Sequence, residues 1–177
     1  MTDSPTPRLF VALWPDAAVR AGLVALRDTW TWPPGARPVA DENLHLTLHF
    51  IGSFPRERID PLGCALAAIV PREPTRLIVK GTDLWRGGVA VLTLRAEPGL
   101  VALQADIGRA LSTLGVTLDE RPFAPHVTMA RKARGARPPA AHPELGWQAN
   151  GFALVESRGG ARPDYRVLAT WRAAQGD

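Results

Sequence analysis

The chain of 177 residues contains one cysteine, two lysines and no long apolar stretch. The single cysteine, Cys64, cannot form an internal disulfide and lies in an apolar helical pattern, so we expect a buried structural thiol rather than a nucleophile. The longest fully apolar run, residues 64–70, is far shorter than the ~20 residues that a membrane-spanning helix needs. The N-terminal residues lack a basic leader. We therefore expect a cytoplasmic protein with no membrane partner.

The positive charge is almost entirely arginine, because Lys80 and Lys132 are the only lysines. The net charge is +4, from 21 basic and 17 acidic residues. Guanidinium groups suit bidentate contacts to phosphate, so this balance weakly favours an anionic partner. The chain is also rich in Ala, Pro and Gly, and a general compositional bias is an alternative explanation of the arginines.

Hydrophobic periodicity predicts the secondary structure of a globular protein, in which 46% of residues are hydrophobic. The spacing predicts helices over residues 16–30, 56–70 and 98–114, with Asp16 as the N-cap of the first. Residues 31–38 are predicted to be a loop. Residues 131–146 carry no hydrophobic period and are predicted to be an exposed loop. Strands are predicted over residues 8–14, 43–52, 75–85, 88–96, 125–131, 151–157 and 165–171.

The two halves of the chain share one order of elements: a strand, an amphipathic helix, a loop and a strand that carries His-x-Thr. The helix start at Asp16 precedes His45 by 29 residues, and the helix start near Pro98 precedes His126 by 28. The repeat predicts an α+β fold, with residues 1–177 forming a single two-lobed domain. Its two pseudo-symmetric lobes would have antiparallel sheets that face a central cleft, with the helices outside.

The segment "HLTLHF", residues 45–50, sets two imidazoles and a hydroxyl among apolar residues. On a strand, alternate residues share a face. Strict alternation therefore predicts that His45, Thr47 and His49 lie on the solvent face. It predicts that Leu46, Leu48 and Phe50 point into the core. His45 and His49 would lie roughly 13 Å apart along a strand, too far for one metal ion with bonds of ~2 Å. We therefore expect no metal and no other cofactor.

The segment "HVTM", residues 126–129, repeats the His-x-Thr pattern. A pair of imidazoles on facing strands can divide the two proton transfers of a phosphoester displacement, since one accepts a proton from water and the other protonates the leaving oxygen. The two threonine hydroxyls can donate hydrogen bonds to phosphoryl oxygens. A satisfied polar strand face is the alternative. Two copies at matching places weaken that alternative, and the residues alone leave both open.

The segments "ENLHLTLHFIG" (42–52) and "PHVTMAR" (125–131) resemble the paired motifs of the two-histidine phosphoesterase superfamily. The opening "RLFVALWPD" (8–16) and the ending "LVESRGGARPDYRVLATW" (154–171) are similar to its branch of RNA 2′,3′-cyclic phosphodiesterases, also called 2′-5′ RNA ligases. This resemblance covers nearly the whole chain. It implies metal-independent hydrolysis of RNA 2′,3′-cyclic phosphate ends to 2′-phosphomonoesters, with reversible 2′-5′ RNA ligation as a second activity.

The resemblance also implies roles for four residues by their position in the motifs. His45 corresponds to the proton donor to the leaving 3′ oxygen, and His126 to the proton acceptor that activates water. The near symmetry of the site leaves these two roles open to exchange. Thr47 and Thr128 correspond to the phosphate-binding hydroxyls.

Arg131 matches a basic position that follows the second motif in the family. Strict alternation places it on the face opposite His126, so it reaches phosphate only if the strand ends or twists there. A solvated arginine is the alternative. Three further cations of the same loop would either follow an RNA backbone or keep the loop soluble: Lys132, Arg134 and Arg137.

The remaining predictions concern the base and the partner. Phe10, Phe123 and Tyr165 are candidates for stacking a terminal base, although the core is the preferred place for Phe10. His49 departs from the family pattern, which often has Lys, and we assign it no chemistry. The expected partner is RNA with a 2′,3′-cyclic phosphate or a 2′-5′ linkage, such as a tRNA fragment, bound by a monomer. A non-catalytic RNA-end binding module and a phosphodiesterase of small cyclic nucleotides are the alternatives.

Overall fold

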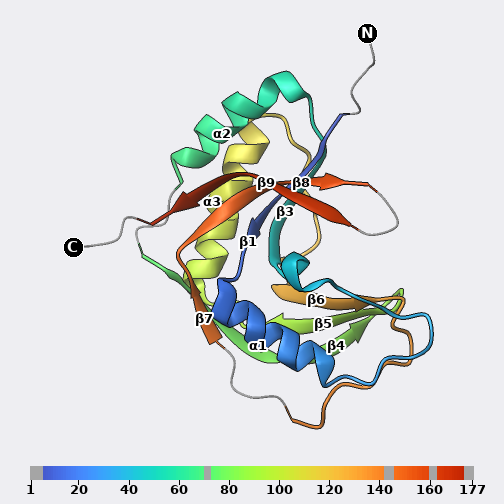
Figure 1. Cartoon of the computed structure of the whole chain (residues 1–177). Helices are drawn as coiled ribbons and strands as arrows, with labels where there is room; N and C mark the ends of the chain where they lie inside the picture. The colour runs from blue at the N-terminus through green and yellow to red at the C-terminus, as the bar shows by residue number, and fades with distance from the viewer. Residues whose placement is uncertain (1–5, 70–72, 142–145, 160–162, 174–177) are drawn as a thin grey trace.

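The computed structural model describes residues 6–69, 73–141, 146–159 and 163–173, and its helices and strands are labelled in Figure 1. The helices are α1 (Ala17–Asp28), α2 (Ile59–Ala67) and α3 (Pro98–Thr113), with short 3₁₀ turns at Asp41–Asn43 and Arg56–Arg58. The strands are β1 (Arg8–Leu13), β2 (Arg37–Pro38), β3 (Leu46–Ser53), β4 (Thr75–Trp85), β5 (Val89–Leu94), β6 (His126–Arg131), β7 (Gly146–Ala149), β8 (Gly151–Arg158) and β9 (Asp164–Arg172). None of these helices is long and apolar enough to cross a bilayer.

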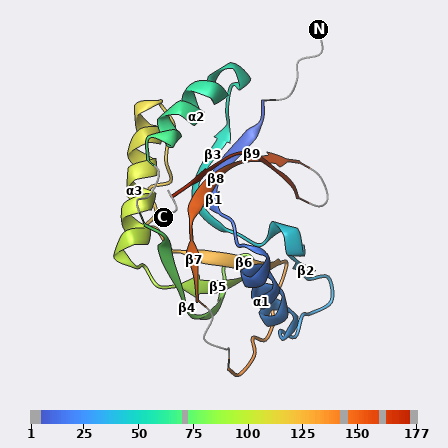
Figure 2. The same cartoon turned by 60° about the vertical axis from the view of Figure 1, so that its left-hand side comes forward.

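The strands form one antiparallel sheet in the order β7-β4-β5-β6-β3-β1-β8-β9, and β2 pairs with β6 beside this path. A single residue pair, Leu46 with Val127, joins β3 to β6. The sheet therefore consists of two four-stranded half-sheets, which Figures 1 and 2 show inclined to each other. This arrangement confirms the α+β fold with antiparallel strands. The two predicted lobes share one continuous sheet.

The long elements agree with the hydrophobic periodicity. The N-cap of α1 is Asp16, whose side chain accepts a hydrogen bond from the backbone N–H of Val19 at 2.8 Å. The two predicted loops are more ordered than expected, because β2 lies in one and β7 begins at the end of the other. The second loop is also tied down where the Ala133 N–H donates to the Gly88 carbonyl at 2.8 Å. The predicted exposure of this loop is therefore wrong at the buried Ala133.

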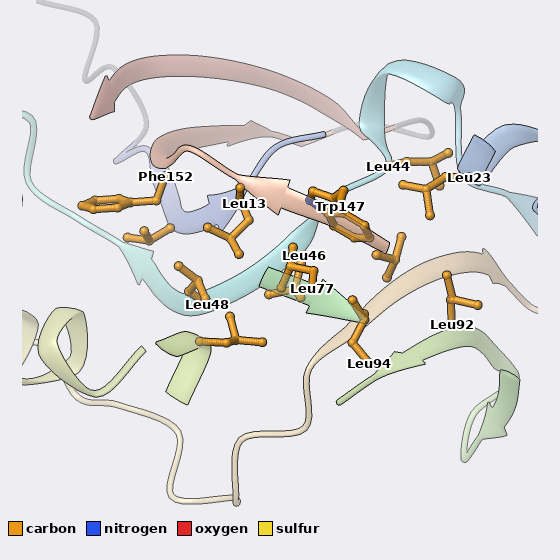
Figure 3. Close-up of a cluster of buried hydrophobic side chains, with 14 of the residues drawn as sticks. Leu13, Leu23, Leu44, Leu46, Leu48, Leu77, Leu92, Leu94, Trp147 and Phe152 are labelled. Carbon is orange, nitrogen blue, oxygen red and sulfur yellow. The ribbon is translucent and has the colours of Figure 1, made fainter. Parts of the chain in front are cut away.

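The main core lies on one face of the sheet, and all three helices pack against it. Figure 3 shows leucines of β1, β3, β4 and β5 meeting there, together with Trp147 of β7 and Phe152 of β8. On α2, Leu62 and Leu66 are fully buried. Cys64 lies halfway between them, which turns its side chain away from the core, and it is exposed. The expected buried thiol is wrong for this reason.

The opposite face of the sheet carries His45 and His126, and we call it the histidine face. Strand β3 changes which side chains reach this face at a bulge. Ala12 of β1 pairs with Thr47 and Val11 pairs with His49, so Leu48 is an extra residue in β3. A bulge of one residue reverses the alternation beyond it. Leu46 and Leu48 are buried as expected, whereas Phe50 is 63% exposed.

Candidate active site

The two His-x-Thr motifs meet where the half-sheets join. The pairing of Leu46 with Val127 places His45 beside Thr128 and Thr47 beside His126 in the antiparallel register. Since Leu46 and Val127 are both fully buried on the core side, their neighbours in sequence lie on the histidine face. The fold thus brings together two residues that are 81 positions apart in the chain.

Both imidazoles are held by the same kind of backbone hydrogen bond. Nδ1 of His45 lies 2.6 Å from the Asn43 carbonyl oxygen, and Nδ1 of His126 lies 2.7 Å from the Ala124 carbonyl oxygen. A carbonyl oxygen only accepts, so Nδ1 carries the proton in each ring. Nε2 is then the nitrogen that gains or loses a proton. In His45 it lies 3.1 Å from the Thr47 hydroxyl, which can donate to the neutral ring.

Aromatic side chains fix the rings in place. The Trp14 indole stacks on the His45 ring at 5.0 Å and 3°. Phe10 lies 5.1 Å from the same ring, and Tyr165 meets it edge-on at 5.4 Å. Among the described residues, His126 has one aromatic neighbour, Trp85, whose ring lies 4.3 Å from the imidazole. The indole of Trp85 is itself held by its N–H, which donates to Asp83 at 3.0 Å.

Burial makes both histidines weak bases in the free protein. Burial is the main reason why the pKa of His45 falls to about 4; the hydrogen bond to Asn43 opposes the change, and the nearby His126 and Arg131 add to it. Burial also lowers the pKa of His126; the hydrogen bond to Ala124 opposes this, and the charge of Arg131 adds to the lowering. Both rings are therefore neutral at pH 7 before substrate binds, with Nε2 free to accept a proton.

Arg131 reaches the histidine face because β6 also contains a bulge. Val91 of β5 pairs with Thr128 and Ala90 pairs with Ala130, which leaves Met129 as the extra residue. The reversed alternation puts Ala130 into the core and turns Arg131 to the side of His126. The expectation from strict alternation is wrong for this reason.

Arg37 joins the site through the two-residue strand β2. It is the antiparallel partner of Arg131, and residues directly opposite in such a pair point to the same face. Arg37 is exposed. No pattern in the sequence indicates this residue, because the segment around it has no hydrophobic period.

The three candidates for base stacking lie in different places. Phe10 is buried, with 3% exposure, and packs against the His45 ring, so it cannot stack a base. Phe123 is partly buried and packs against the main core. Tyr165 is partly buried and holds His45 edge-on. Sequence reasoning missed Trp14 and Trp85 as neighbours of the histidines, since their approach depends on tertiary packing.

His49 does not belong to the site. Beyond the bulge it points to α3, where its Nε2 donates to the Gln104 carbonyl at 2.7 Å. Burial lowers its pKa, and this hydrogen bond opposes the change. Within the described residues, no group of three or more His, Cys, Asp or Glu side chains is placed to hold a metal ion.

Several known proteins are similar to this chain in sequence. A family model described as LigT-like phosphoesterase matches residues 13–91. The chain is 33% identical over 182 residues to the RNA 2′,3′-cyclic phosphodiesterase of Escherichia coli, and the match covers 97% of this chain and 99% of that one. It is 35% identical to the protein of the same name from Thermus thermophilus, covering 91% and 87%. A match to the protein of that name from Geobacillus stearothermophilus spans 56% of this chain but a third of the relative's length.

Solved structures of the same kind of protein have a similar fold. The crystal structure of E. coli LigT in its apo form superposes with a TM-score of 0.80 at 30% identity, covering 97% of this chain and all of the other. The resemblance inferred from the two motifs is thereby confirmed at the level of the family. This chain belongs to the LigT-like phosphoesterases.

Proposed function

We propose that this protein hydrolyses RNA 2′,3′-cyclic phosphate ends to 2′-phosphomonoesters, without a metal ion, by acid–base catalysis at His45 and His126. One observation carries the proposal: both imidazoles are held at Nδ1 by a backbone carbonyl, so each presents Nε2 on the same face of the sheet. A pure binding site would not need two rings in one tautomer. The activity named for the E. coli and Thermus relatives supports the same reaction.

In the proposed reaction, Nε2 of His126 takes a proton from a water molecule as its oxygen attacks phosphorus. The bond between phosphorus and the 3′ oxygen breaks, and Nε2 of His45 gives its proton to that oxygen. The products are a 3′-hydroxyl and a 2′-phosphomonoester. One proton is gained by His126 and one is lost by His45, so the two rings must exchange protons with solvent before the next cycle.

In this mechanism, the substrate must raise the pKa of His45 before the ring can act as the proton donor. Because the pKa of His45 is about 4 in the free protein, few molecules carry the required proton at pH 7. An anionic phosphate beside the ring favours the charged form and typically raises such a pKa by about one to three units. The bound phosphate thus promotes the protonation of His45, which then serves as the proton donor. The Thr47 hydroxyl, released from Nε2 of His45, then donates to a phosphoryl oxygen, as does Thr128.

The guanidinium of Arg131 is the proposed contact for the cyclic phosphate, since its charge already acts on His45, His126 and Tyr165. The rest of the RNA strand would follow exposed cations of two loops that run together. The loops pair at Arg37 with Arg131 and again at Thr31 with Arg137. Figure 1 shows them side by side. Lys132, Arg134 and Arg137 are exposed along this path.

Phosphorus NMR of an oligonucleotide that ends in a 2′,3′-cyclic phosphate tests the proposal. In the presence of EDTA we expect the cyclic resonance to be replaced by that of a 2′-phosphate. His45→Ala and His126→Ala should each lower kcat by ~10²-fold or more. His49→Gln is the matched control, a histidine on the same strand that faces α3, and should keep the activity. Near-normal turnover in both alanine variants would disprove the proposal, and salt-sensitive binding without turnover would favour a binding module.

A cytoplasmic location, a monomeric state and a single domain over residues 1–177 stay predictions. Reversible 2′-5′ ligation is the same chemistry with a 5′-hydroxyl in place of water, and it needs no further residue. Quantifying 2′-5′ joined product at high RNA concentration tests it separately.

A further inference from the structure

Asn43 lies two residues before His45, and its side chain connects two segments that are far apart in the sequence. It is buried, with 8% exposure. Its side-chain amide donates a hydrogen bond to the Pro163 carbonyl oxygen at 2.9 Å, across 120 positions of the chain. A carbonyl oxygen only accepts, so the amide nitrogen is the atom that faces it. A buried polar side chain with a single distant partner fixes the relative position of the two segments.

The backbone of Asn43 is fixed at the same time. A 3₁₀ turn, Asp41–Asn43, ends at this residue. The start of the turn is held by Arg27 of α1, whose guanidinium donates to the Asp41 carboxylate at 2.6 Å. The Asn43 carbonyl oxygen accepts the hydrogen bond from Nδ1 of His45 at 2.6 Å. The position of this carbonyl is therefore set by the turn on one side and by the side-chain amide on the other.

The second motif holds the equivalent carbonyl in a different way. Ala124 has the same place two residues before His126, and Pro125 follows it. A proline restricts the residue before it to extended conformations, so the backbone itself limits the movement of the Ala124 carbonyl. In the first motif Leu44 takes the place of Pro125 and adds no such restriction. The amide of Asn43 thus supplies a constraint that proline supplies in the other copy.

The same hydrogen bond aligns a second contact of the His45 ring. Pro163 lies two residues before Tyr165, and Tyr165 meets the His45 ring edge-on at 5.4 Å. The amide of Asn43 therefore ties the segment that carries the imidazole to the segment that carries the phenol ring. Loss of this bond would release the acceptor of Nδ1 and the edge-on contact together.

We propose that Asn43 is a positioning residue for His45. Its amide, anchored on the Pro163 carbonyl, keeps the Asn43 backbone carbonyl on Nδ1 and so keeps the ring in the tautomer that presents Nε2 to the substrate. The effect on turnover rests on the proposed function. Without a fixed acceptor at Nδ1, the proton of the neutral ring is shared between both nitrogens. The charged ring also loses a hydrogen bond that favours it, which lowers the pKa of His45 further.

Nitrogen-15 NMR of the free protein at pH 7 tests the tautomer without turnover. In Asn43→Ala and Asn43→Leu we expect the chemical shifts of the two His45 ring nitrogens to move toward each other, because the tautomers mix. Those of His126 should stay in place. Asn43→Leu keeps the branched shape of the side chain and removes its polar atoms, and a thermal melt checks that each variant folds. Asn150→Ala is the matched control at the other, exposed asparagine and should change neither ring.

The pH dependence of kcat, measured with an oligonucleotide that ends in a 2′,3′-cyclic phosphate, separates positioning from a merely structural role. The proton donor must be charged, so the rate falls as the pH rises through its pKa in the complex. A lower pKa moves this alkaline limb to lower pH. We expect that shift in both Asn43 variants, with kcat at pH 7 lowered by ~10- to 100-fold, as for partners that orient metal-bound imidazoles. The charges of His126 and Arg131, which also act on His45, are the same in every variant.

Two results would overturn the proposal. One is an unchanged tautomer of His45 in both Asn43 variants. The other is a loss of kcat without a shift of the alkaline limb, which would show that Asn43 only stabilises the fold. If the unmodified protein did not open the cyclic phosphate, the proposed function would fail, and the NMR measurement would still decide whether Asn43 holds the tautomer.

Discussion

His45 is enclosed by Trp14, Phe10 and Tyr165, and this enclosure has two opposite effects on its charge. Burial holds its pKa near 4. The face of the stacked indole, in contrast, attracts a cation, so it favours the imidazolium once a phosphate has drawn a proton to the ring. In its proposed role, His45 is therefore rarely protonated in the free protein and becomes protonated in the complex with the phosphate.

The protonation of His45 can be followed directly. We expect the ring C–H resonances of His45 to titrate with a pKa of about 4 in the free protein, and the pKa to rise by about one to three units with a saturating 2′-phosphomonoester. Proton NMR with His45→Gln for the assignment measures both values. His49 contacts α3 instead of the site, so its titration should not respond to the ligand, and an unmoved His45 would contradict the proposed role.

The two histidines of the proposed site could be found in the sequence because each belongs to a short motif, and the structure places the two motifs side by side. The spacing of His45, Thr47, His126 and Thr128 shows the two copies of the motif. It left a polar strand face as an alternative, and the resemblance to a known family was what favoured a site. The surroundings of the pair could not be predicted in this way. Trp14 approaches His45 from the end of β1, and its contact is set by tertiary packing that leaves no local pattern.

At the level of the elements, the sequence predicted the long helices and strands, whose hydrophobic periods are regular. It failed at the two bulges, because an extra residue leaves the alternation of apolar letters almost unchanged while reversing the faces beyond it. Phe50 and His49 were exchanged between core and solvent for this reason, and Arg131 was placed on the wrong face. Strand β2 was missed because two residues cannot establish a period.

The contact between β3 and α3 depends on Gly108. A Cβ atom there would lie 3.1 Å from the His49 ring, closer than most real contacts. We expect Gly108→Ala to be less favourable in the presence of His49 than in a His49→Ala background, by about 1 kcal/mol in the free energy of unfolding. Urea denaturation of the two single variants and the double variant measures this coupling. Strict additivity would show that the ring does not press on the helix.

At the scale of the whole molecule, the pairing of two loops gathers part of the excess positive charge on one surface beside the site. Arg37, on β2, lies beside Arg131 and extends the basic surface away from the histidines. We expect Arg37→Gln to raise KM for an oligonucleotide substrate several-fold and to weaken its dependence on salt, since one phosphate contact is lost. A cyclic mononucleotide has no such phosphate and should be unaffected. Arg109→Gln, on α3, is the control at a distance, and equal effects on both substrates would place Arg37 at the cyclic phosphate instead.

The single pair that joins β3 to β6 has a consequence for how the chain could be divided. The half-sheet with β1 and β3 is completed by β8 and β9, so strands from both ends of the chain build it. The other half-sheet, β4 to β7, is an insertion in that framework. A fragment cut at the boundary of the sequence repeat would keep His45 but leave the β8 side of β1 as an open, apolar edge that invites aggregation. The repeat visible in the sequence is therefore not a pair of separable folding units, and separating the two half-sheets would require cutting the chain on both sides of residues 75–149, into three pieces.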